Sequence, residues 1–515
     1  MLRKLTERIN EMEGKEFPSK TYRRMVLQPA YDEAKKYFLT AMVQIHVAHL
    51  KMLEERGIVK KSDARTIGKA LAVLDVDYYS TDPYNPLFED LFFRIEHDLI
   101  GQVGEVAGNL HIARSRNDMG IAIYRMTLRK KLLELMSEMI ALKDALIIFC
   151  EEHIDTVMIG YTHTQQAQPT TLAHYLKAVI DQLGRDFKRV QAAFATVNRS
   201  SMGAAALTTS GFAISRERMR DLLAFDEVIE NSWDAVAGAD YITEAASAVQ
   251  LAALNMGRTV QDLLIWATQE FNVFTLASPY VQISSIMPQK RNPVSIEHMR
   301  SLLSAVVGDA NTVLTMVHNT PFGDIVDTED DMQPFLWKAI DRLIGIYQLF
   351  GSVVLTMKVN KDQLRKRAEK SFATVTELAD TLVRTEKASF RQAHQMVSQC
   401  VQQLMETDQA SIQGLTWEAV NQESLKILHR KLTISKEDFQ KALNPVHFIA
   451  VRNVLGGPNE EVMKESLLRS KEMAKESMQW LNEKEHSMIM AEKLLTSFVT
   501  DWRNDHDGNG SGGNA

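Results

Sequence analysis

Apolar residues in the middle of the chain recur in steps of three and four. A period near 3.5 residues lets a long helix keep one face against its partners. One row has large side chains: Leu128, Leu132, Leu135, Met139, Leu142, Leu146 and Phe149. A second has smaller ones: Ala245, Val249, Ala252, Met256, Val260, Leu263 and Ala267. The rows predict two very long helices, and the small side chains favour a close approach between helices.

Three more segments continue this pattern. One follows Pro293 to Val317, another runs from about Phe335 to Met357, and a shorter one follows Thr171. Only 24 glycines and 12 prolines occur in 515 residues, below the usual combined share of about 12%. We therefore expect an all-α chain with a central bundle of very long helices. Long helices that are apolar all round favour packing between subunits, with a monomeric bundle as the alternative.

The predicted bundle, residues 111–360, is the second of three helical domains. Residues 1–110 form the first and include a helix near 34–56 that Gly57 closes. Residues 361–503 form the third domain, for which the sequence predicts short helices with capped starts such as Ser435-Lys436-Glu437-Asp438. Residues 504–515 are rich in Gly, Asn and Ser, which predicts a disordered tail.

Composition excludes several classes of function. The formal net charge is −7, so nothing indicates a nucleic-acid partner or an anionic membrane. No apolar run reaches the roughly 20 residues of a membrane span, and the start of the chain lacks a signal-peptide pattern. Only Cys150 and Cys400 are present, and no metal-binding, phosphate-loop or dinucleotide motif occurs. We expect a cytoplasmic protein without metal or cofactor.

The segment from Ser284 to Pro293, Ser-Ser-Ile-Met-Pro-Gln-Lys-Arg-Asn-Pro, holds the most informative chemistry. Asn292 is predicted as a helix N-cap and Pro293 as the first helical residue. A helix N-terminus beside Lys290 is suited to an anion, and the serine hydroxyls lie next to it. This combination suits proton abstraction from a carbon next to a carboxylate, whereas the plain alternative is a capped surface loop.

Two other segments gather polar side chains. His111-Ile112-Ala113-Arg114-Ser115-Arg116-Asn117-Asp118 precedes the Leu128 row and is predicted to start a helix. An arginine at this helix start can bind a carboxylate through two parallel hydrogen bonds. The alternative is that the segment is only a solvated, charged turn. Gly160-Tyr161-Thr162-His163-Thr164-Gln165-Gln166-Ala167-Gln168-Pro169 is uncharged. Its Thr and Gln side chains can fix the tautomer of His163, although a lone histidine is often structural.

These segments together resemble a known family. The Ser284 segment is similar to the S-S-x-M-P-x-K-x-N-P motif of the fumarase/aspartase superfamily. The His111 and Gly160 segments resemble H-T-x-R-S-R-N-D and G-Y-T-H-x-Q-x-A-Q-P of its argininosuccinate lyase branch. Asn231-Ser232-Trp233-Asp234-Ala235-Val236 and Asp331-Met332-Gln333 resemble N-S-L-D-A-V and D-M-Q. The resemblance covers residues 85–340 well and the ends weakly.

The resemblance implies a homotetramer with each active site built from three subunits, and a carbon–nitrogen lyase that releases fumarate from an N-substituted aspartate. Argininosuccinate is the best named substrate. Ser284 matches the catalytic base, His163 the histidine that pairs with a glutamate, here Glu297, and Lys290 a group that holds the reacting carboxylate. The implied substrate-binding residues are Ser115, Arg116, Asn117, Thr162, Asn292 and Gln333.

The chemistry fits these residue types. Removing the weakly acidic Cβ proton produces an aci-carboxylate dianion, which preformed cationic and amide donors stabilise, by about 3 kcal/mol per donor. A serine base needs the same positive surroundings, because its alkoxide is otherwise inaccessible at neutral pH.

Some family positions are changed. This chain has Phe92 where the family has a histidine, Ala239 where it has an arginine, and Leu336 where it has a lysine. Residues 322–330 form an acidic stretch. The glycine before the family serine is Ile283, and the N-terminal L-W-G-G-R-F is absent. Since these changes fall on the leaving-amine side, a lyase for another adduct, such as ethylenediamine disuccinate, is an alternative. An alternative of another class is a non-catalytic structural protein like the lens crystallins of the family.

Overall fold

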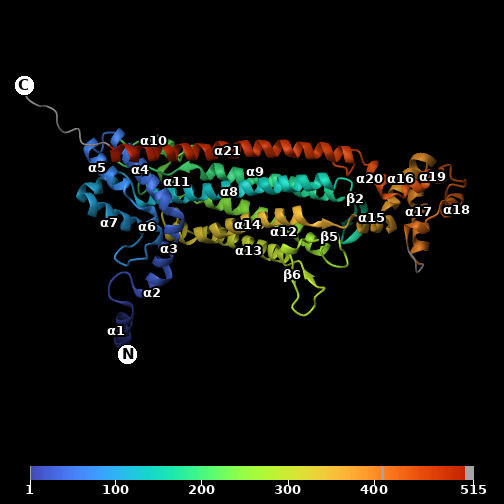
Figure 1. Ribbon diagram of the computed structural model, residues 1–515, viewed down its shortest axis with the longest axis horizontal. Coiled ribbons are helices and arrows are strands. Elements are labelled where there is room, and N and C mark those ends of the chain that lie inside the picture. The colour runs from blue at the N-terminus through green and yellow to red at the C-terminus, as the bar shows by residue number, and fades with distance from the viewer. Residues whose placement is uncertain (1, 407–410, 505–515) are drawn as a thin grey trace, which may run out of the picture.

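The computed structural model describes residues 2–406 and 411–504, and it is an all-α structure built around long helices. The central bundle consists of α8 (Arg116–Glu152), α9 (Leu172–Val197), α12 (Asp240–Trp266), α13 (Val294–Val317) and α14 (Gln333–Thr356). These helices run along the long axis of the molecule (Figure 1). The predicted fold class is confirmed, and the apolar rows lie where the sequence pattern placed them.

The apolar row of α8 forms the centre of the bundle. Leu128, Leu132, Leu135 and Leu146 are fully buried, where α8 packs against α9 and α14. The small residues of α12 face α13 and α9, and Ala245 and Val249 have no exposed surface. Small side chains allow the backbones to approach closely, as the sequence predicted.

Short helices form a cap at one end of the bundle (Figure 1). The helix predicted near residues 34–56 is present as η2 and α4, and Gly57 follows it with a φ of +68°. The elements are α1 (Leu2–Glu13), α2 (Lys20–Tyr22), the π-helix η1 (Arg23–Leu27), α3 (Gln28–Glu33), the π-helix η2 (Ala34–Phe38), α4 (Leu39–Glu55), α5 (Lys61–Ala72), α6 (Val76–Thr81), α7 (Leu91–Val103) and the 3₁₀-helix η3 (Gly104–His111).

The opposite end carries a second group of short helices with its own apolar core. They are α15 (Lys361–Lys370), η6 (Phe372–Thr374), α16 (Val375–Glu386), α17 (Phe390–Met405), η7 (Ile412–Gly414), α18 (Trp417–Ile427), α19 (Lys436–Ala442) and α20 (Pro445–Ala450). The predicted capped start is present, because the Ser435 hydroxyl accepts the Asp438 amide at 3.0 Å.

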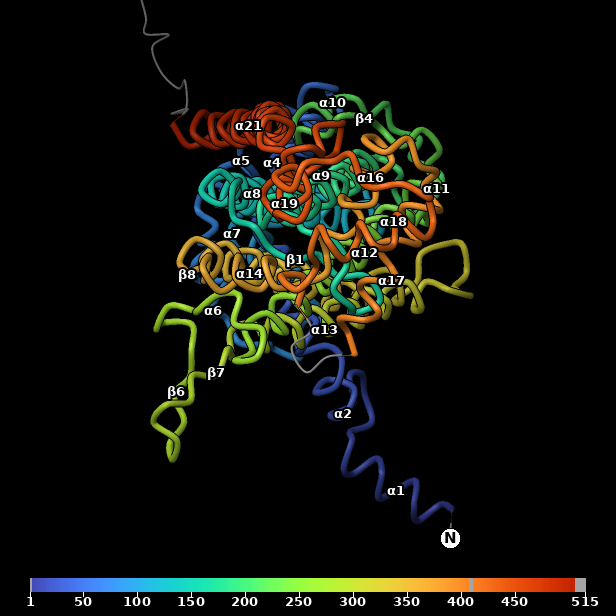
Figure 2. The backbone as a smooth tube through the Cα atoms, turned by 90° about the vertical axis from the view of Figure 1, so that its right-hand side faces the viewer, coloured from blue at the N-terminus to red at the C-terminus, as the bar shows by residue number. Residues whose placement is uncertain are grey.

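The last part of the chain differs from the sequence prediction of short helices. Residues Glu460–Asn504 form one helix of 45 residues, α21, which returns along the bundle to the opposite end (Figures 1 and 2). It packs against α8, α5 and α4. The segment contains neither Gly nor Pro, and a Gly-Gly-Pro turn at residues 456–458 precedes it, so nothing interrupts the helix. The predicted disordered tail, apart from Asn504, lies outside the described residues.

Gly68 permits the far end of α21 to dock. A Cβ atom at Gly68 would lie 2.4 Å from Cδ2 of Trp502. Because α5 has no side chain there, the Trp502 ring packs directly on its backbone and is 7% exposed.

Strands are short. The hairpin of β1 (Val157–Thr162) and β2 (Gln165–Thr171) leads into α9. A second hairpin pairs β6 (Gln282–Ile283) with β7 (Arg291–Asn292) and projects from the bundle in both views (Figures 1 and 2). The other elements are β3 (Arg199–Ser200), α10 (Arg216–Leu222), β4 (Glu227–Val228), α11 (Ser232–Ala237), β5 (Phe274–Thr275), η4 (Ser278–Tyr280), η5 (Asp327–Asp331) and β8 (Lys358–Val359).

The predicted start of α13 is corrected by the β6–β7 hairpin. Asn292 pairs with Gln282 in the hairpin, and Pro293 is the N-cap, without a side-chain cap bond. The helix begins at Val294. Asn292, which the local sequence pattern predicts as a helix N-cap, is therefore part of a β-strand instead.

One helical stretch in the described part of the chain, residues 327–356, is long and apolar enough to span a membrane on length and composition. It comprises η5 and α14, and Leu336, Trp337 and Ile340 are buried among the other bundle helices. Its apolar character is that of a core helix.

Candidate active site

The N-terminal turn of α8 places three predicted binding residues at one end of the bundle. Ser115 is the N-cap, and its Oγ accepts the Asn117 amide at 3.3 Å and donates to Asn117 Oδ1 at 2.6 Å. Asp118 completes a capping box by accepting the Ser115 amide at 2.9 Å. The Ser-x-x-Asp spacing explains this local structure, and the sequence prediction of a helix start is confirmed.

Arg116 is already paired with carboxylates in the free chain. Its Nη1 lies 2.8 Å from Asp90 Oδ2 and 3.3 Å from Glu89 Oε1. The guanidinium also lies 4.6 Å from the centre of the Phe93 ring. A substrate carboxylate that binds Arg116 must share it with these two acids.

A cavity of about 490 Å³ opens beside this turn. Its walls come from the N-terminal cap, the first turns of α8 and the acidic segment before α14. Arg116 and Asn117 line it together with Tyr31, Phe38 and Tyr124. It therefore combines an apolar wall with two of the residues predicted to bind substrate.

The acidic segment faces this cavity. Asp324, Glu329, Asp330 and Asp331 all line it, and Tyr124 Oη donates to Asp330 Oδ1 at 3.1 Å. Burial, followed by the neighbouring Asp324 and Asp330, raises the pKa of Glu329 to about 8. The cavity consequently has a strong excess of carboxyl groups over its one lining cation, Arg116.

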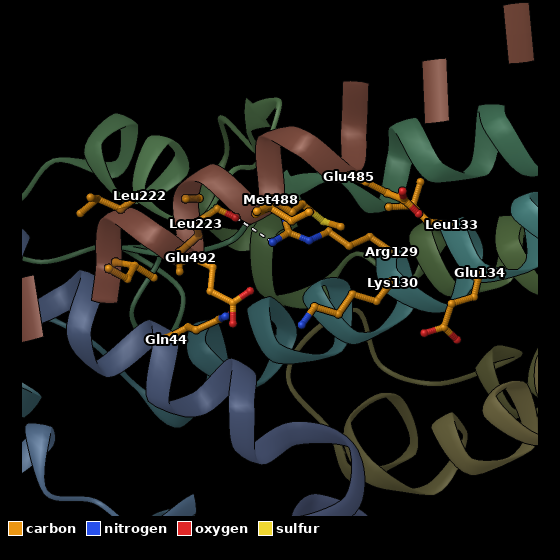
Figure 3. A pocket seen from close by; sticks show the side chains of 13 residues that line it. Gln44, Arg129, Lys130, Leu133, Glu134, Leu222, Leu223, Glu485, Met488 and Glu492 are labelled. Carbon is orange, nitrogen blue, oxygen red and sulfur yellow. Dashed lines mark hydrogen bonds between the residues drawn. The ribbon is translucent and has the colours of Figure 1, made fainter. Parts of the chain in front are cut away.

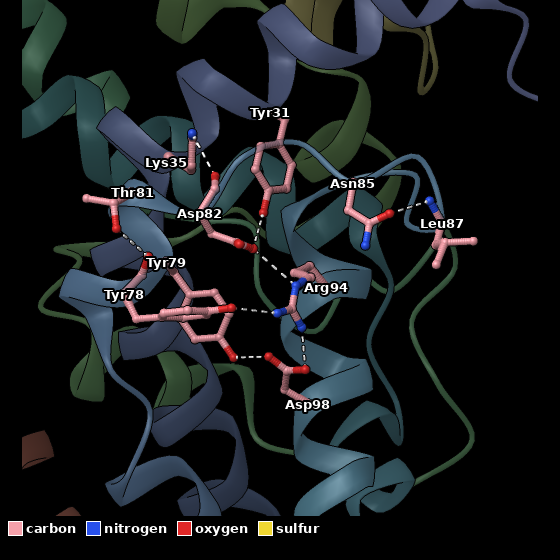
Figure 4. Close-up of polar contacts among 10 residues, drawn as sticks. All are labelled: Tyr31, Lys35, Tyr78, Tyr79, Thr81, Asp82, Asn85, Leu87, Arg94 and Asp98. Atoms are coloured by element: carbon pink, nitrogen blue, oxygen red, sulfur yellow. Dashed lines mark hydrogen bonds and ion pairs between the residues drawn. The ribbon is translucent and has the colours of Figure 1, made fainter.

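A polar network supports the outer wall of the cavity (Figure 4). Tyr31 Oη donates to Asp82 Oδ2 at 3.2 Å, and Arg94 Nε donates to the same oxygen at 3.1 Å. Arg94 also pairs with Asp98, whose Oδ2 accepts from Tyr79 at 2.6 Å. Since Arg94 is held by these internal partners, we do not assign it to substrate binding.

The changed family positions are mostly part of the core. Leu336 is fully buried and Phe92 is 4% exposed, with its ring centre 5.5 Å from that of His111 and 5.7 Å from the Arg114 guanidinium. Gln333 is also fully buried, and its Nε2 donates to the Thr328 carbonyl at 2.9 Å. Contact between Gln333 and substrate stays a prediction.

Thr162 and His163 lie at the β1–β2 hairpin, beyond the other end of α8. Both side chains are exposed. His163 has a φ of +51° and Thr164 a φ of +62°, so two non-glycine residues adopt the left-handed conformation that makes this tight turn. No side-chain partner of His163 occurs within residues 2–406 and 411–504, which leaves the imidazole free to meet another surface.

The projecting β6–β7 hairpin carries Ser284 and Lys290. Ser284 Oγ accepts the amides of Ile286 and Met287 at 3.3 and 3.1 Å, and the Ser284 amide donates to the Lys290 carbonyl at 3.4 Å. Lys290 is exposed, as is Glu297 in the first turn of α13. Ile283 and Ile286 on this hairpin are 71% and 83% exposed.

One chain does not bring the predicted residues together. Ser115 precedes α8 and His163 follows it, and a helix of 37 residues spans about 55 Å at 1.5 Å per residue. The structure joins Ser115, Arg116 and Asn117 in one turn, and it joins Ser284, Lys290 and Asn292 in one hairpin. The sequence singled out these groups but gave no role to Asp118 or Tyr124, whose partners lie far along the chain.

A cavity at another place in the bundle is lined by none of the predicted site residues. It has a volume of about 230 Å³ and lies between α4, α8 and α21 (Figure 3). There Arg129 donates to the Leu223 carbonyl at 2.7 Å and to the Ala224 carbonyl at 3.0 Å, which caps the end of α10. No cluster of three or more His, Cys, Asp or Glu side chains suited to a metal ion occurs in the part of the chain that the structure describes.

Known proteins match both the sequence and the fold. A family model described as lyase matches residues 53–308, and one described as argininosuccinate lyase C-terminal matches residues 372–450. Argininosuccinate lyase 2 of Agrobacterium fabrum is 39% identical over 459 residues, covering 87% of this chain and 90% of that protein. Argininosuccinate lyase of Methanosarcina mazei is 37% identical, covering 85% of this chain and 88% of that protein.

Among solved structures, EDDS lyase in complex with formate superposes with a TM-score of 0.82 at 29% identity, covering 92% of this chain and 96% of that chain. A double variant of EDDS lyase with bound fumarate gives a TM-score of 0.81 at the same identity and coverage. A 3-carboxy-cis,cis-muconate lactonizing enzyme from Pseudomonas putida, at 18% identity, shares the fold with a TM-score of 0.67. The chain belongs to the argininosuccinate lyase branch of the fumarase/aspartase superfamily.

Proposed function

We propose that this protein is a carbon–nitrogen lyase that reversibly eliminates fumarate from an N-substituted aspartate. One observation supports this proposal most directly. The complete motif Ser-Ser-Ile-Met-Pro-Gln-Lys-Arg-Asn-Pro lies on an exposed, projecting hairpin in a member of this family. A serine with a lysine and an asparagine close by is the set of groups that a carbanion mechanism requires.

In this mechanism Ser284 removes the Cβ proton, and Lys290 and Asn292 hold the carboxylate that takes up the developing charge. The C–N bond then breaks to give fumarate, and the amine leaves with a proton from a general acid. Ser284 Oγ accepts two amides of its own loop in the free chain. Those amide donors favour the charged form of the hydroxyl, and Lys290 on the same hairpin supplies a positive charge. His163, paired with Glu297, and Thr162 approach from the β1–β2 hairpin, while Ser115, Arg116, Asn117 and Gln333 complete the substrate side.

A homotetramer with shared sites follows from the separation of these groups. Apolar side chains support such an assembly, because Leu251 and Leu254 on α12 and Leu302 on α13 are 39–48% exposed along the long helices. In the proposed assembly, α8 of one subunit, the Ser284 hairpin of a second and the His163 hairpin of a third form one site. The proposal includes no metal, organic cofactor, nucleic acid or membrane, and places the enzyme in the cytoplasm.

Argininosuccinate is the first candidate substrate, since two relatives above 35% identity are argininosuccinate lyases. It would yield arginine and fumarate. The second candidate is another amine adduct of fumarate, such as ethylenediamine disuccinate. A specific observation favours it: the cavity beside Arg116 is lined by four carboxyl groups from residues 324–331, and the changed positions 92 and 336 are apolar core.

The test is kcat/KM for argininosuccinate against ethylenediamine disuccinate and related adducts, together with the reverse reaction of fumarate with a panel of amines. We expect an amine adduct other than argininosuccinate to be turned over best. A clear preference for argininosuccinate would overturn the second candidate and assign the enzyme to arginine formation. Absence of turnover with every adduct would overturn the enzyme proposal in favour of a crystallin-like structural role.

A further inference from the structure

Asp118 is a buried carboxylate in the first turn of α8, and it has no exposed surface. Its Oδ1 accepts the Ser115 amide at 2.9 Å, and its Oδ2 accepts the amides of Gly203 and Ala205 at 2.8 and 3.0 Å. Its backbone carbonyl accepts the Ser201 hydroxyl at 2.7 Å. One residue thus joins the α8 cap to a loop that lies more than 80 positions later.

That loop is itself held firmly. Ser201, Met202 and Ala204 have no exposed surface. Arg216 clamps it from α10, with Nε donating to the Met202 carbonyl at 3.1 Å. Gly203 has a φ of +83°, and a Cβ there would lie 2.7 Å from Arg216 Cγ. The loop is therefore a rigid support rather than a mobile segment.

We propose that Asp118 is a positioning residue, which fixes the turn of Ser115, Arg116 and Asn117 in the conformation that binds a carboxylate of the substrate. This inference rests on the proposed function. Without the anchor, the Ser115 amide loses its acceptor and the turn loses its link to the 201–205 loop. A capping box alone would supply only the hydrogen bond from the Ser115 amide to Asp118, and not the bonds to the 201–205 loop.

The surroundings of Asp118 contain few charges. Arg114, just before α8, and Arg216, on α10, act on it electrostatically, and neither forms an ion pair with it. The Arg114 guanidinium instead donates to His46 Nδ1 at 2.9 Å. Burial raises the pKa of Asp118 to about 6 against the opposing effect of its three amide bonds. Protonation of the anchor consequently falls in an experimentally accessible pH range.

The chain offers a matched control for this role. Asp438 occupies the same Ser-x-x-Asp position in α19, where it accepts the Ser435 hydroxyl at 2.7 Å. It is exposed, belongs to the C-terminal helices and touches no predicted site residue. Asp438→Asn replaces a carboxylate at the same helix position. Asp118→Asn in addition places an NH2 donor opposite either the Ser115 amide or the amides of Gly203 and Ala205, so one of the two links of the anchor is lost.

The experiment measures steady-state kinetics and calorimetric fumarate binding for the full-length tetramer of each variant. For Asp118→Asn we expect kcat/KM to fall on the order of 100-fold, chiefly through KM, with a matching rise in the fumarate Kd. Asp438→Asn should stay within twofold. The ratio of Kd between Asp118→Asn and wild type should approach one below pH 6, because the wild-type carboxyl is then uncharged, as the amide of the variant is at every pH.

Three results separate the possible failures. A fumarate Kd for Asp118→Asn within threefold of wild type, or a ratio independent of pH, overturns the inference. If Asp118→Asn does not fold, Ser201→Ala decides, since it removes only the bond to the Asp118 carbonyl, and an unchanged Kd overturns the inference. Wild type that binds no fumarate contradicts the proposed function itself.

Discussion

The α8 turn and the β6–β7 hairpin both carry predicted site residues, yet they are built in opposite ways. At the α8 turn, Asp118 is buried and fully bonded, and its loop partners are fixed by Arg216. In the hairpin, Ser284 has partners only within its own loop, and Ile286 is 83% exposed.

The difference separates two tasks. The groups at the α8 turn that the proposed function assigns to substrate binding are preorganised inside one chain, which would lower the entropy that binding must overcome. The groups that the proposed function assigns to the chemistry lie on an exposed hairpin that projects from the bundle (Figure 1). Substitutions in the hairpin should therefore change rate with little effect on stability, while those beside α8 should change both binding and stability.

The largest expected effect comes from Ser284→Ala. Without the base, elimination should fall by about 10³-fold or more, while the melting temperature and the assembly remain as in wild type because the hairpin is exposed. Ser285→Ala, on the next residue of the same loop, is the control and should change the rate less than tenfold. Activity of Ser284→Ala within tenfold of wild type would show that another group is the base.

Lys290→Met should have the next largest effect. Loss of the ammonium beside the dianion should cost about 3 kcal/mol of transition-state stabilisation, or roughly 100-fold in kcat. Arg291→Met removes an equal charge from the same hairpin and should change kcat much less. An effect confined to KM would mean that Lys290 only binds the substrate.

The two ends can be tested together by mixing subunits. Tetramers of His163→Asn alone and of Ser284→Ala alone should both be inactive. Mixed tetramers should recover part of the activity, because some sites then combine an intact hairpin from each parent. Verified mixed tetramers without recovery, or a monomer by light scattering, would contradict shared sites.

The smallest expected effect concerns stability at Glu329. Its pKa is raised from 4.5 to about 8, by burial first and then by Asp324, so the folded state holds this proton more tightly than the unfolded state. The free energy of unfolding therefore falls as pH rises from about 4.5 through 8. Glu329→Gln removes this dependence.

The melting temperature of Glu329→Gln relative to wild type should accordingly increase from pH 5 to pH 9. Asp331→Asn, which lowers the charge of the same segment, is the control. A difference between Glu329→Gln and wild type that does not change with pH would contradict the raised pKa.

Much of the fold was accessible from the sequence, because the 3.5-residue apolar rows of α8 and α12 are long and regular. α21 was not recognised, since its buried face includes Ser470 and Ala474 among many charged residues. The absence of Gly and Pro from residues 460–504 was the available signal.

For the site, local patterns were sufficient where the partners are local. The Ser115 cap follows from its spacing to Asp118, and the structure contains it. Asn292 was misplaced because its pairing with Gln282 depends on a strand ten residues away. The bonds that Asp118 accepts from Gly203 and Ala205 had no sequence signal, because the two segments are separated by the rest of α8, the β1–β2 hairpin and α9.

The return of α21 to the N-terminal cap has a consequence for biosynthesis. Gly68 in α5 receives Trp502 from α21, so α5 completes this packing only after more than 400 further residues have been synthesised. Contacts so distant along the chain form slowly, since a long loop must close first. The face of α5 that Trp502 covers therefore stays open until synthesis has reached α21, and it can make non-native contacts during that time.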